Sequence, residues 1–320
     1  MKLTEYCTPE RLDEIVYPMD LSGMKQGDWL AANRDAILAR VDSDGVVLLR
    51  DLNVISSGQF ATIASTLFGG GLLAYTNRST PRTELKGNVY TSTEYPREES
   101  IPQHNENAYS HEWPSRIAFF CLVAAERGGA TPIADSRAVY AAIPAEIREK
   151  FERKKVTYVR HYSSVGLPWQ EVFQVDTRAE VGMYCERHGI AYEWLDENHL
   201  RTRQVCPAVA THRASGAKVW FNQAHLFHVS NHAEANHDAL MQTFGEEFLP
   251  RHAYYGDGEP IEEDVLATIR DVYESLKLSF AWRGGDLMLL DNMLYSHGRD
   301  PFEGPRKVLV AMAEARSWND

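Results

Sequence analysis

The 320-residue sequence lacks any apolar run near the ~18 residues that a membrane-spanning helix needs. Its first residues also lack the basic start and apolar stretch of a signal peptide, so we expect a cytoplasmic protein. Cysteine is scarce, with only Cys7, Cys121, Cys185 and Cys206, and no two of them form a CxxC pair. This spacing argues against a zinc knuckle or a disulfide framework and predicts free thiols.

Basic residues are outnumbered as well. The 33 Lys and Arg residues and 45 Asp and Glu residues give a formal net charge of -12, without an obvious basic cluster. A nucleic-acid-binding face needs such a cluster, so we expect no nucleic-acid partner. With 44% apolar and 24% charged residues, the composition is that of a globular protein. The length allows a large core in one or two domains.

Three residues stand out against this ordinary background: His104, Glu106 and the distant His297. Two imidazoles and one carboxylate can hold a metal on one face and leave the other face open, as in non-haem Fe(II) oxygenases. His104 and Glu106 are two residues apart, so their side chains point the same way if the segment is extended. We therefore expect one strand to supply both, and His297, which follows the apolar run 287–290, to lie on a neighbouring strand.

The His-x-Glu pair is weak support by itself. With 45 acidic residues and 12 histidines, roughly one or two such pairs are expected by chance. A second pair, His232 and Glu234, begins a helical pattern, where residues two apart diverge around the axis. We expect this second pair to be solvated.

The segments after each ligand add support. Residues 117–124 are typical of a buried strand, and the paired glycines at 128–129 indicate a turn into a further strand. Apolar residues also precede His297, and another apolar strand begins after Pro305.

In order, the motifs HNE, GGATPIADSR, GDLMLLDN, HG and PRKVLV resemble the taurine/2,4-D dioxygenase superfamily of Fe(II)/2-oxoglutarate oxygenases. The glutamate in HNE, with STPR (79–82) and YTSTEYP (90–96) ahead of it, is most similar to the clavaminate synthase-like branch and its syringomycin-type amino-acyl hydroxylases. The resemblance covers roughly residues 40–315, and its specificity lies in the ordered set of motifs.

The resemblance implies that His104, Glu106 and His297 bind Fe(II). It implies that Arg306 forms a fork with the distal carboxylate of the co-substrate 2-oxoglutarate, and that Thr131 donates a hydrogen bond to this co-substrate. Lys307 points to the opposite face of an extended strand, so an error of one residue in register would exchange the roles of Arg306 and Lys307.

The chemistry implied is oxidation by O2, coupled to decarboxylation of 2-oxoglutarate, at an unactivated carbon. Halogenases of this family have a small residue in place of the carboxylate ligand, whereas Glu106 is present here. Hydroxylation is therefore favoured, and desaturation or epoxidation stays open. The substrate implied is an amino acid in natural product biosynthesis, free or bound to a carrier protein, and a homo-oligomer is left open by the sequence.

The fold class implied is α+β, with a double-stranded β-helix (jelly-roll) core buttressed by helices. Because remote ligands must meet at one ion, we expect a single domain over residues 1–320, with a helical insert at roughly 230–278. Local signals predict helices from Pro9 and over residues 28–40, 57–68, 135–143, 144–154, 176–187 and 261–276, and further strands at 45–50, 218–222 and 280–282.

Substrate contacts are expected on segments that flank the metal ligands. The candidates are Arg82, Thr93, Asn107, Tyr109, Asn222, His225, His228 and Arg299. Each has a structural alternative, such as an ion pair for the arginines or simple packing for Tyr109. Several arginines near the metal would suit a carboxylate-bearing substrate.

Two other classes of protein remain open at this stage. A zinc hydrolase also uses two His, one Glu and an open position, but it gives no reason for Thr131 and Arg306 to follow the ligands. Turnover with Zn(II) and without oxygen would distinguish it. A non-catalytic jelly-roll binding module would bind Fe(II) weakly or not at all.

Overall fold

The computed structural model describes residues 7–319 except 78, 80, 81, 86, 93, 94 and 164. Its largest sheet has five antiparallel strands. In spatial order the strands are β1 (Val46–Leu49), β13 (Leu287–Asp291), β4 (Glu112–Val123), β16 (Lys307–Ser317) and β2 (Val89–Thr91).

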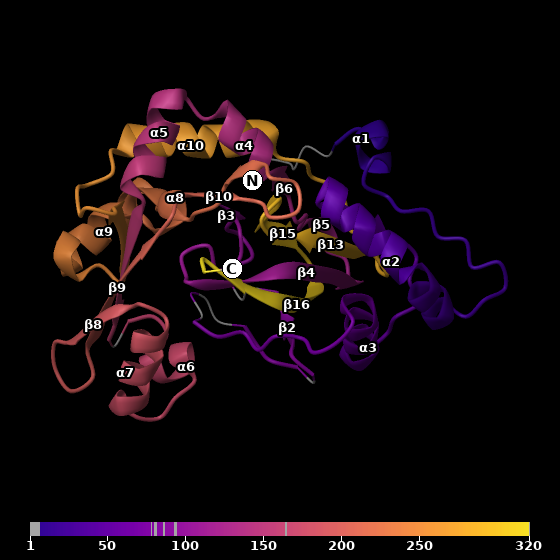
Figure 1. Ribbon diagram of the computed structural model, residues 1–320, viewed down its shortest axis with the longest axis horizontal. Helices are drawn as coiled ribbons and strands as arrows, with labels where there is room; N and C mark the ends of the chain where they lie inside the picture. Colours follow the sequence, from indigo (N-terminus) through magenta and orange to yellow (C-terminus); the bar gives the residue numbers. More distant parts are fainter. Residues whose placement is uncertain are drawn as a thin grey trace.

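Both faces of this sheet are buried, each by a different partner. Alternate residues of β4, such as Ala118 and Phe120, pack into a core with α2 (Gln26–Asp44) and α3 (Ser57–Phe68), which lie along one side of the sheet (Figure 1). The residues between them belong to a second core on the opposite face. Burial on both faces explains why these strands are continuous apolar runs in the sequence.

A three-stranded antiparallel sheet lies over that opposite face. Its order is β3 (Ile101–His104), β14 (Tyr295–Arg299) and β6 (Ile133–Asp135). The ring of Phe119 on β4 lies 4.9 Å from the ring of His297 on β14. The two sheets therefore meet at the histidine that the sequence singled out.

The remaining strands form three smaller antiparallel sheets. The four-stranded one has the order β12 (Arg251–Tyr255), β7 (Val156–Tyr162), β9 (Leu200–Cys206), β8 (Ala191–Trp194); the two pairs are β10 (Val209–Thr211) with β11 (Lys218–Trp220), and β15 (Phe302–Glu303) with β5 (Arg127–Gly128).

Helices lie around these sheets. Figure 1 shows α4 (Ser136–Ala142), α5 (Ala145–Lys154) and α10 (Glu263–Leu276) gathered on one side, and α6 (Trp169–Phe173) and α7 (Arg178–Arg187) beside β8. The others are α1 (Pro9–Asp13), α8 (Ala224–Phe227), α9 (Glu234–Phe244) and the short 3-10 helices η1 (Val229–Asn231) and η2 (Glu246–Phe248). No helix in the described part of the chain is both long enough and apolar enough to cross a membrane.

Several local predictions are confirmed, including the expected mixture of helices and antiparallel sheets. The helix α3 spans the predicted residues, because Ser56 caps it by accepting a hydrogen bond from Gln59 N at 3.3 Å and Gly69 ends it in the left-handed region at φ 75°. Asp135 caps α4 in the same way. All four cysteines are free thiols, as predicted.

Two predictions of secondary structure are wrong. Residues 280–282 are irregular and form no strand, although the side chains of Phe280 and Trp282 are buried. Apolar side chains indicate burial, and the side chains of an irregular segment can be buried as well as those of a strand. Residues 230–278 are not wholly helical, because the strand β12 lies between α9 and α10 and pairs with β7.

Candidate metal centre

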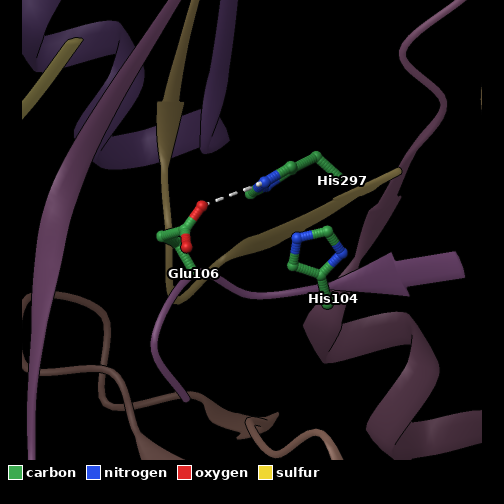
Figure 2. Close-up of side chains that lie close together, drawn as sticks. All are labelled: His104, Glu106 and His297. Carbon is green, nitrogen blue, oxygen red and sulfur yellow. Dashed lines mark ion pairs between the residues drawn. The ribbon is translucent and has the colours of Figure 1, made fainter. Parts of the chain in front are cut away.

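His104 and His297 lie side by side on neighbouring strands. The register of β3 and β14 places them directly opposite each other, with ring centroids 4.6 Å apart. The sequence predicted this meeting of two remote segments, and the strand pairing confirms it. Figure 2 shows both rings facing the carboxylate of Glu106.

Glu106 reaches the same place by a different route from the one predicted. The strand β3 ends at His104, and Glu106 lies in the turn that follows, so one strand does not supply both side chains. Asn107 adopts the left-handed conformation at φ 56°, which asparagine tolerates better than most residues. Glu106 Oε2 nevertheless lies 3.8 Å from His297 Nε2.

Asn292 holds this turn in place. Its Oδ1 accepts a hydrogen bond from Glu106 N at 2.7 Å, and its Nδ2 donates to Glu106 O and Pro114 O, each at 2.9 Å. The main-chain carbonyl of Asn292 also accepts a hydrogen bond from Asn105 Nδ2 at 2.7 Å. The side chain of Asn292 is fully buried. The peptide group of Glu106 is therefore fixed by a residue 186 positions away.

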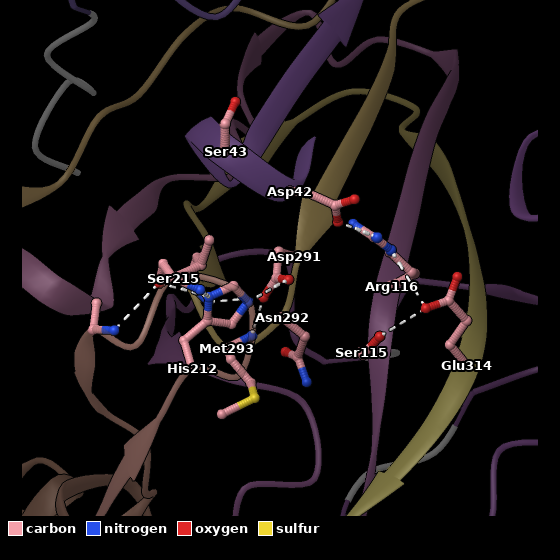
Figure 3. A network of polar contacts seen from close by, with 12 residues as sticks. Asp42, Ser43, Ser115, Arg116, His212, Ser215, Asp291, Asn292, Met293 and Glu314 are labelled. Atoms are coloured by element: carbon pink, nitrogen blue, oxygen red, sulfur yellow. Dashed lines mark hydrogen bonds and ion pairs between the residues drawn. The ribbon is translucent and has the colours of Figure 1, made fainter. Parts of the chain in front are cut away.

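Asp291 and His212 support Asn292 in turn (Figure 3). Asp291 Oδ1 accepts hydrogen bonds from the main-chain N–H groups of Met293 and Leu294, at 2.9 and 3.0 Å. The other carboxylate oxygen lies 3.2 Å from His212 Nε2. These contacts set the turn between β13 and β14, and with it the direction of Asn292.

The carboxylate of Glu106 is ionised. Arg82 Nη2 donates to Glu106 Oε2 at 2.6 Å, and each of these side chains is only 3% exposed. Burial by itself disfavours the charged form, but the Arg82 guanidinium outweighs it and holds the pKa of Glu106 well below its usual range. The group is thus a carboxylate anion, the form that binds a metal.

His104 is neutral, with a defined tautomer. Its Nδ1 lies 2.8 Å from the carbonyl oxygen of Pro102, which can only accept, so Nδ1 carries the proton and Nε2 keeps its lone pair. Burial, together with the nearby His297, lowers the pKa of His104 to about 3. The ring is therefore available as a ligand at neutral pH.

The ring of His297 is not held by a hydrogen bond to any described residue. Burial lowers the pKa of His297, and neither ring nitrogen has a hydrogen-bond partner among the residues that the structure describes. Its contact with Glu106 is too long for a hydrogen bond at 3.8 Å. Buried polar atoms rarely stay unpartnered, so these nitrogens indicate a ligand from outside the chain.

One metal ion fits these three groups. Their ligand atoms all lie within 4.8 Å of one another, a spacing that one ion can bridge with small side-chain rotations. Two neutral imidazoles and one carboxylate suit Fe(II), and such a set leaves further positions open. Zn(II) also accepts these ligands, so the surroundings must distinguish the two chemistries.

Arg306 and Thr131 lie together beside the two histidines. Arg306 donates from Nε to Gly129 O at 2.9 Å, from Nη1 to Ser92 Oγ at 3.2 Å and from Nη2 to Thr131 Oγ1 at 3.3 Å. Burial, with a contribution from nearby Arg299, lowers the pKa of Arg306 to about 10, so it stays charged at neutral pH. Lys307 is exposed. The geometry thus favours Arg306 over Lys307 as the buried cation.

A small cavity lies between the two histidines and the pair Arg306 and Thr131. Its walls include His104, His297, Thr131 and Arg306, and its volume is about 30 Å³. This is roughly the volume of one water molecule. A larger anion can bind here only if Arg306 exchanges its hydroxyl partners for the oxygens of that anion and the walls move apart.

A larger cavity, of about 400 Å³, adjoins the same ligands. His104 and Glu106 form part of its wall, and so does Arg82. His232 also lines it, which corrects the expectation that this histidine is simply solvated. The size is within the range of small-molecule binding sites.

Most of the residues suggested as substrate contacts do not line the larger cavity: Asn107, Tyr109, Asn222, His225, His228 and Arg299. Tyr109 donates to Asn77 O at 2.6 Å, and its hydroxyl oxygen lies 3.2 Å from Asn107 Oδ1. Asn222 bonds the main chain of Ala208 and Ala224. These three side chains stabilise the surrounding structure. Thr93 lies outside the described residues.

Three other candidates are also engaged with the protein. His225 Nε2 lies 2.8 Å from Gln103 O, and His228 Nδ1 lies 2.8 Å from Ser230 Oγ. Arg299 lines the small cavity, but its guanidinium donates to the carbonyl oxygens of residues 95, 96 and 99. It holds a segment that lines the larger cavity, whereas Arg82 is the one described candidate that lines that cavity itself.

Sequence reasoning missed two residues of this site. Asn292 belongs to the GDLMLLDN motif, and that motif was the signal that could have identified it. Arg251 lines the larger cavity from β12, a strand in a segment expected to be helical. No local pattern points to Arg251, because its position depends on the pairing of β12 with β7.

A model of a protein family described as "Taurine catabolism dioxygenase TauD, TfdA family" matches residues 6–312. The dapdiamide synthesis protein DdaC of Enterobacter agglomerans is 41% identical over 271 residues, which cover 84% of this chain and 82% of that protein. A clavaminate synthase-like protein of Arabidopsis thaliana is 28% identical over 281 residues, with the same coverage of each chain.

Solved structures share the fold at low sequence identity. An asparagine oxygenase in complex with Fe(II), hydroxyasparagine and succinate has a TM-score of 0.52 at 13% identity, over 89% of this chain and 83% of that one. AAD-2 in complex with Mn(II) and N-oxalylglycine has a TM-score of 0.51 at 14% identity, over 98% and 97% of the two chains.

Replacing His297 tests the metal centre directly. We expect His297→Ala to lose stoichiometric binding of Fe(II) in an anaerobic titration, because two remaining ligands do not hold the ion, and to remain folded, because the imidazole has no hydrogen bond to the described residues. The control is His237→Ala, on α9 and outside the cluster. Unchanged metal binding by His297→Ala would remove this residue from the site.

Asn292→Ala tests the support of the Glu106 turn. It leaves three buried main-chain groups without a partner, so we expect the free energy of unfolding in urea to fall by roughly 2–4 kcal/mol. Fe(II) affinity should fall about 10- to 100-fold, because Glu106 is no longer held in position. Asn198→Ala is the control, since Asn198 is exposed on the surface. Wild-type Fe(II) affinity in Asn292→Ala would contradict this role.

Proposed function

This chain belongs to the TauD/TfdA family and is an Fe(II)- and 2-oxoglutarate-dependent dioxygenase, and we propose that it hydroxylates an unactivated carbon of an amino acid or amino-acyl substrate. The observation that carries the proposal is the arrangement of two cavities around one cluster: His104 lines both, with Arg306 in the small one and Glu106 in the large one. Co-substrate and substrate can therefore approach the same ion from different sides.

We assign the metal to His104, Glu106 and His297. When bound, iron supplies the oxidation of the substrate by O2, coupled to decarboxylation of 2-oxoglutarate. The protein's own part is to hold three ligands on one side and to keep Glu106 ionised, which Arg82 supports through its hydrogen bond. Glu106 itself favours hydroxylation over halogenation, because it fills the position that a halide would need.

We assign the distal carboxylate of 2-oxoglutarate to Arg306 and Thr131. The two terminal nitrogens of Arg306 now donate to hydroxyl groups, which are weaker acceptors than a carboxylate. A carboxylate entering the small cavity can take both donors as a fork, and Thr131 is then free to donate as well. A partly buried arginine beside a threonine hydroxyl is a feature that a zinc hydrolase does not need. Family membership argues against a non-catalytic module.

We also propose that the five-stranded and three-stranded sheets are the two layers of a double-stranded β-helix within a single domain over residues 1–320, with an insert at roughly 230–278. The antiparallel pairing in both sheets and the core between them support this. In addition, both layers contribute to the metal site through Phe119 and His297.

An amino-acid substrate is supported by the charged side chains in the wall of the larger cavity, among them Glu99 and Arg251, and by the similarity to DdaC, a biosynthetic protein. The test is a screen of amino acids, free and loaded on a carrier protein, for succinate formation that depends on Fe(II), 2-oxoglutarate and oxygen. We expect one substrate to stimulate succinate release and to give a product heavier by one oxygen atom. Stimulation without added oxygen in the product would overturn hydroxylation, and no stimulation by any member would overturn the substrate class.

Replacing Arg306 by lysine tests whether 2-oxoglutarate needs two parallel hydrogen bonds or only a positive charge. We expect Arg306→Lys to raise the KM for 2-oxoglutarate by about 10-fold or more, because an ammonium cannot form two parallel hydrogen bonds with a carboxylate. Lys307→Ala should leave this KM unchanged, since Lys307 is exposed. An unchanged KM in Arg306→Lys, with an increase in Lys307→Ala, would transfer the role to Lys307.

Glu106→Ala should abolish hydroxylation, with a loss of about 100-fold or more in kcat/KM, since a metal ligand is removed. The control is Glu98→Ala, because Glu98 is exposed and lies outside the cavities. Activity and Fe(II) binding are measured on the same preparations. Full activity in Glu106→Ala would show that this carboxylate does not coordinate the metal.

A further inference from the structure

Arg251 occupies an unusual position in the larger cavity. It lies at the start of β12, and its side chain lines the same 400 Å³ space as the metal ligands His104 and Glu106. The guanidinium carbon lies 5.5 Å from the centre of the Phe227 ring. A cation is thus held at the wall of the cavity that remains open to a substrate.

Unlike the other arginines around the metal centre, Arg251 makes no side-chain hydrogen bond or ion pair with the described residues. Arg82 is paired with Glu106, Arg299 with three main-chain carbonyl groups, and Arg306 with a carbonyl and two hydroxyl groups. No hydrogen bond or ion pair involves the side chain of Arg251 within the described part of the chain. The side chain is only partly exposed, and a guanidinium there without such partners is less favourable than one in open solvent.

A second cation next to Arg251 makes this position more costly. Arg160 on β7 is its direct cross-strand partner, so both side chains leave the same face of the sheet. Arg160 Nη1 donates to Asn77 Oδ1 at 2.8 Å. Burial lowers the pKa of Arg251, and the nearby Arg160 lowers it further. Like charges directly opposite each other destabilise a strand pair.

An anion that enters the cavity would give Arg251 a partner and would reduce its repulsion with Arg160. Resting on the proposed function, we infer that Arg251 binds a free carboxylate group of the substrate, with Arg160 adding to the positive potential. Arginine suits this role because its planar fork matches the two oxygens of a carboxylate. Glu99 lines the same cavity and carries the opposite charge, so a zwitterionic amino acid finds a group for each of its charges.

This assignment narrows the substrate class. An aminoacyl group tethered to a carrier protein as a thioester has lost its α-carboxylate, whereas a free amino acid retains it. The structure therefore favours a substrate with a free carboxylate over one that is tethered through that group.

The test is a binding titration of the enzyme loaded anaerobically with Fe(II) and 2-oxoglutarate, so that the Arg306 site is filled and no turnover occurs. The ligands are L-amino acids, their primary amides and their small thioesters. For wild-type protein we expect an acid to bind about 10-fold or more tightly than its amide and thioester. Arg251→Met should bind that acid as weakly as the amide, and Arg251→Lys should recover part of the loss.

The matched control is Arg203→Met, which removes an exposed arginine from β9 of the same sheet and should bind like wild type. Equal acid affinity in Arg251→Met and Arg203→Met would overturn the assignment, and so would equal affinity of wild type for acid and amide. Either result leaves the oxygenase proposal intact, because Fe(II)- and oxygen-dependent succinate formation is measured separately.

If no member of the panel binds wild-type protein, the proposed amino-acid substrate class is wrong. The role of Arg251 is then tested with acetate and acetamide. Acetate should then raise the melting temperature of loaded wild type more than acetamide does, and this difference should vanish in Arg251→Met. No difference in wild type would overturn the role of Arg251. In every case Arg251→Met should melt no lower than wild type without ligand, since it removes an unpaired charge; a large decrease would indicate a structural role instead.

Discussion

The burial of one ionised carboxylate is the constraint on which the rest of the site depends. Glu106 is charged although it is almost fully enclosed, and this is tolerated because Arg82 bonds it and two imidazoles lie beside it. The same arrangement leaves His297 without a hydrogen-bond partner among the described residues. A divalent cation resolves both features, since it balances the carboxylate and takes the lone pairs of the two rings.

Holding three ligands on one side requires contacts between distant parts of the chain. The pairing of β3 with β14 aligns the two histidines, and Asn292 fixes the peptide of Glu106 with hydrogen bonds to its N–H and its carbonyl. Because Asn292 follows β13 directly, the large sheet and the metal site are mechanically connected. A rigid frame of this kind lets the iron chemistry proceed with little rearrangement of the ligands.

The arginines divide the surroundings of the metal into separate tasks. Arg82 maintains the charge of a ligand, Arg299 fixes a segment of the cavity wall, and Arg306 faces the small cavity with two donors that a carboxylate can take over. Arg251 lies opposite another arginine and makes no side-chain hydrogen bond or ion pair with the described residues. Without ligand, the pairing of these two arginines is unfavourable. We propose that a carboxylate on the substrate relieves it.

The sequence by itself determined what local rules and motif order control. These are the three candidate metal ligands, the buried apolar strands, and helices such as α3, whose capping residues are adjacent to it in the sequence. Only the tertiary structure decided that Glu106 lies in a turn, that residues 280–282 are irregular, and that Arg251 faces the cavity. Burial and local conformation can be predicted from the type and the spacing of side chains. The direction of a side chain towards a shared site depends on strand pairing between residues far apart, and no local pattern records that pairing.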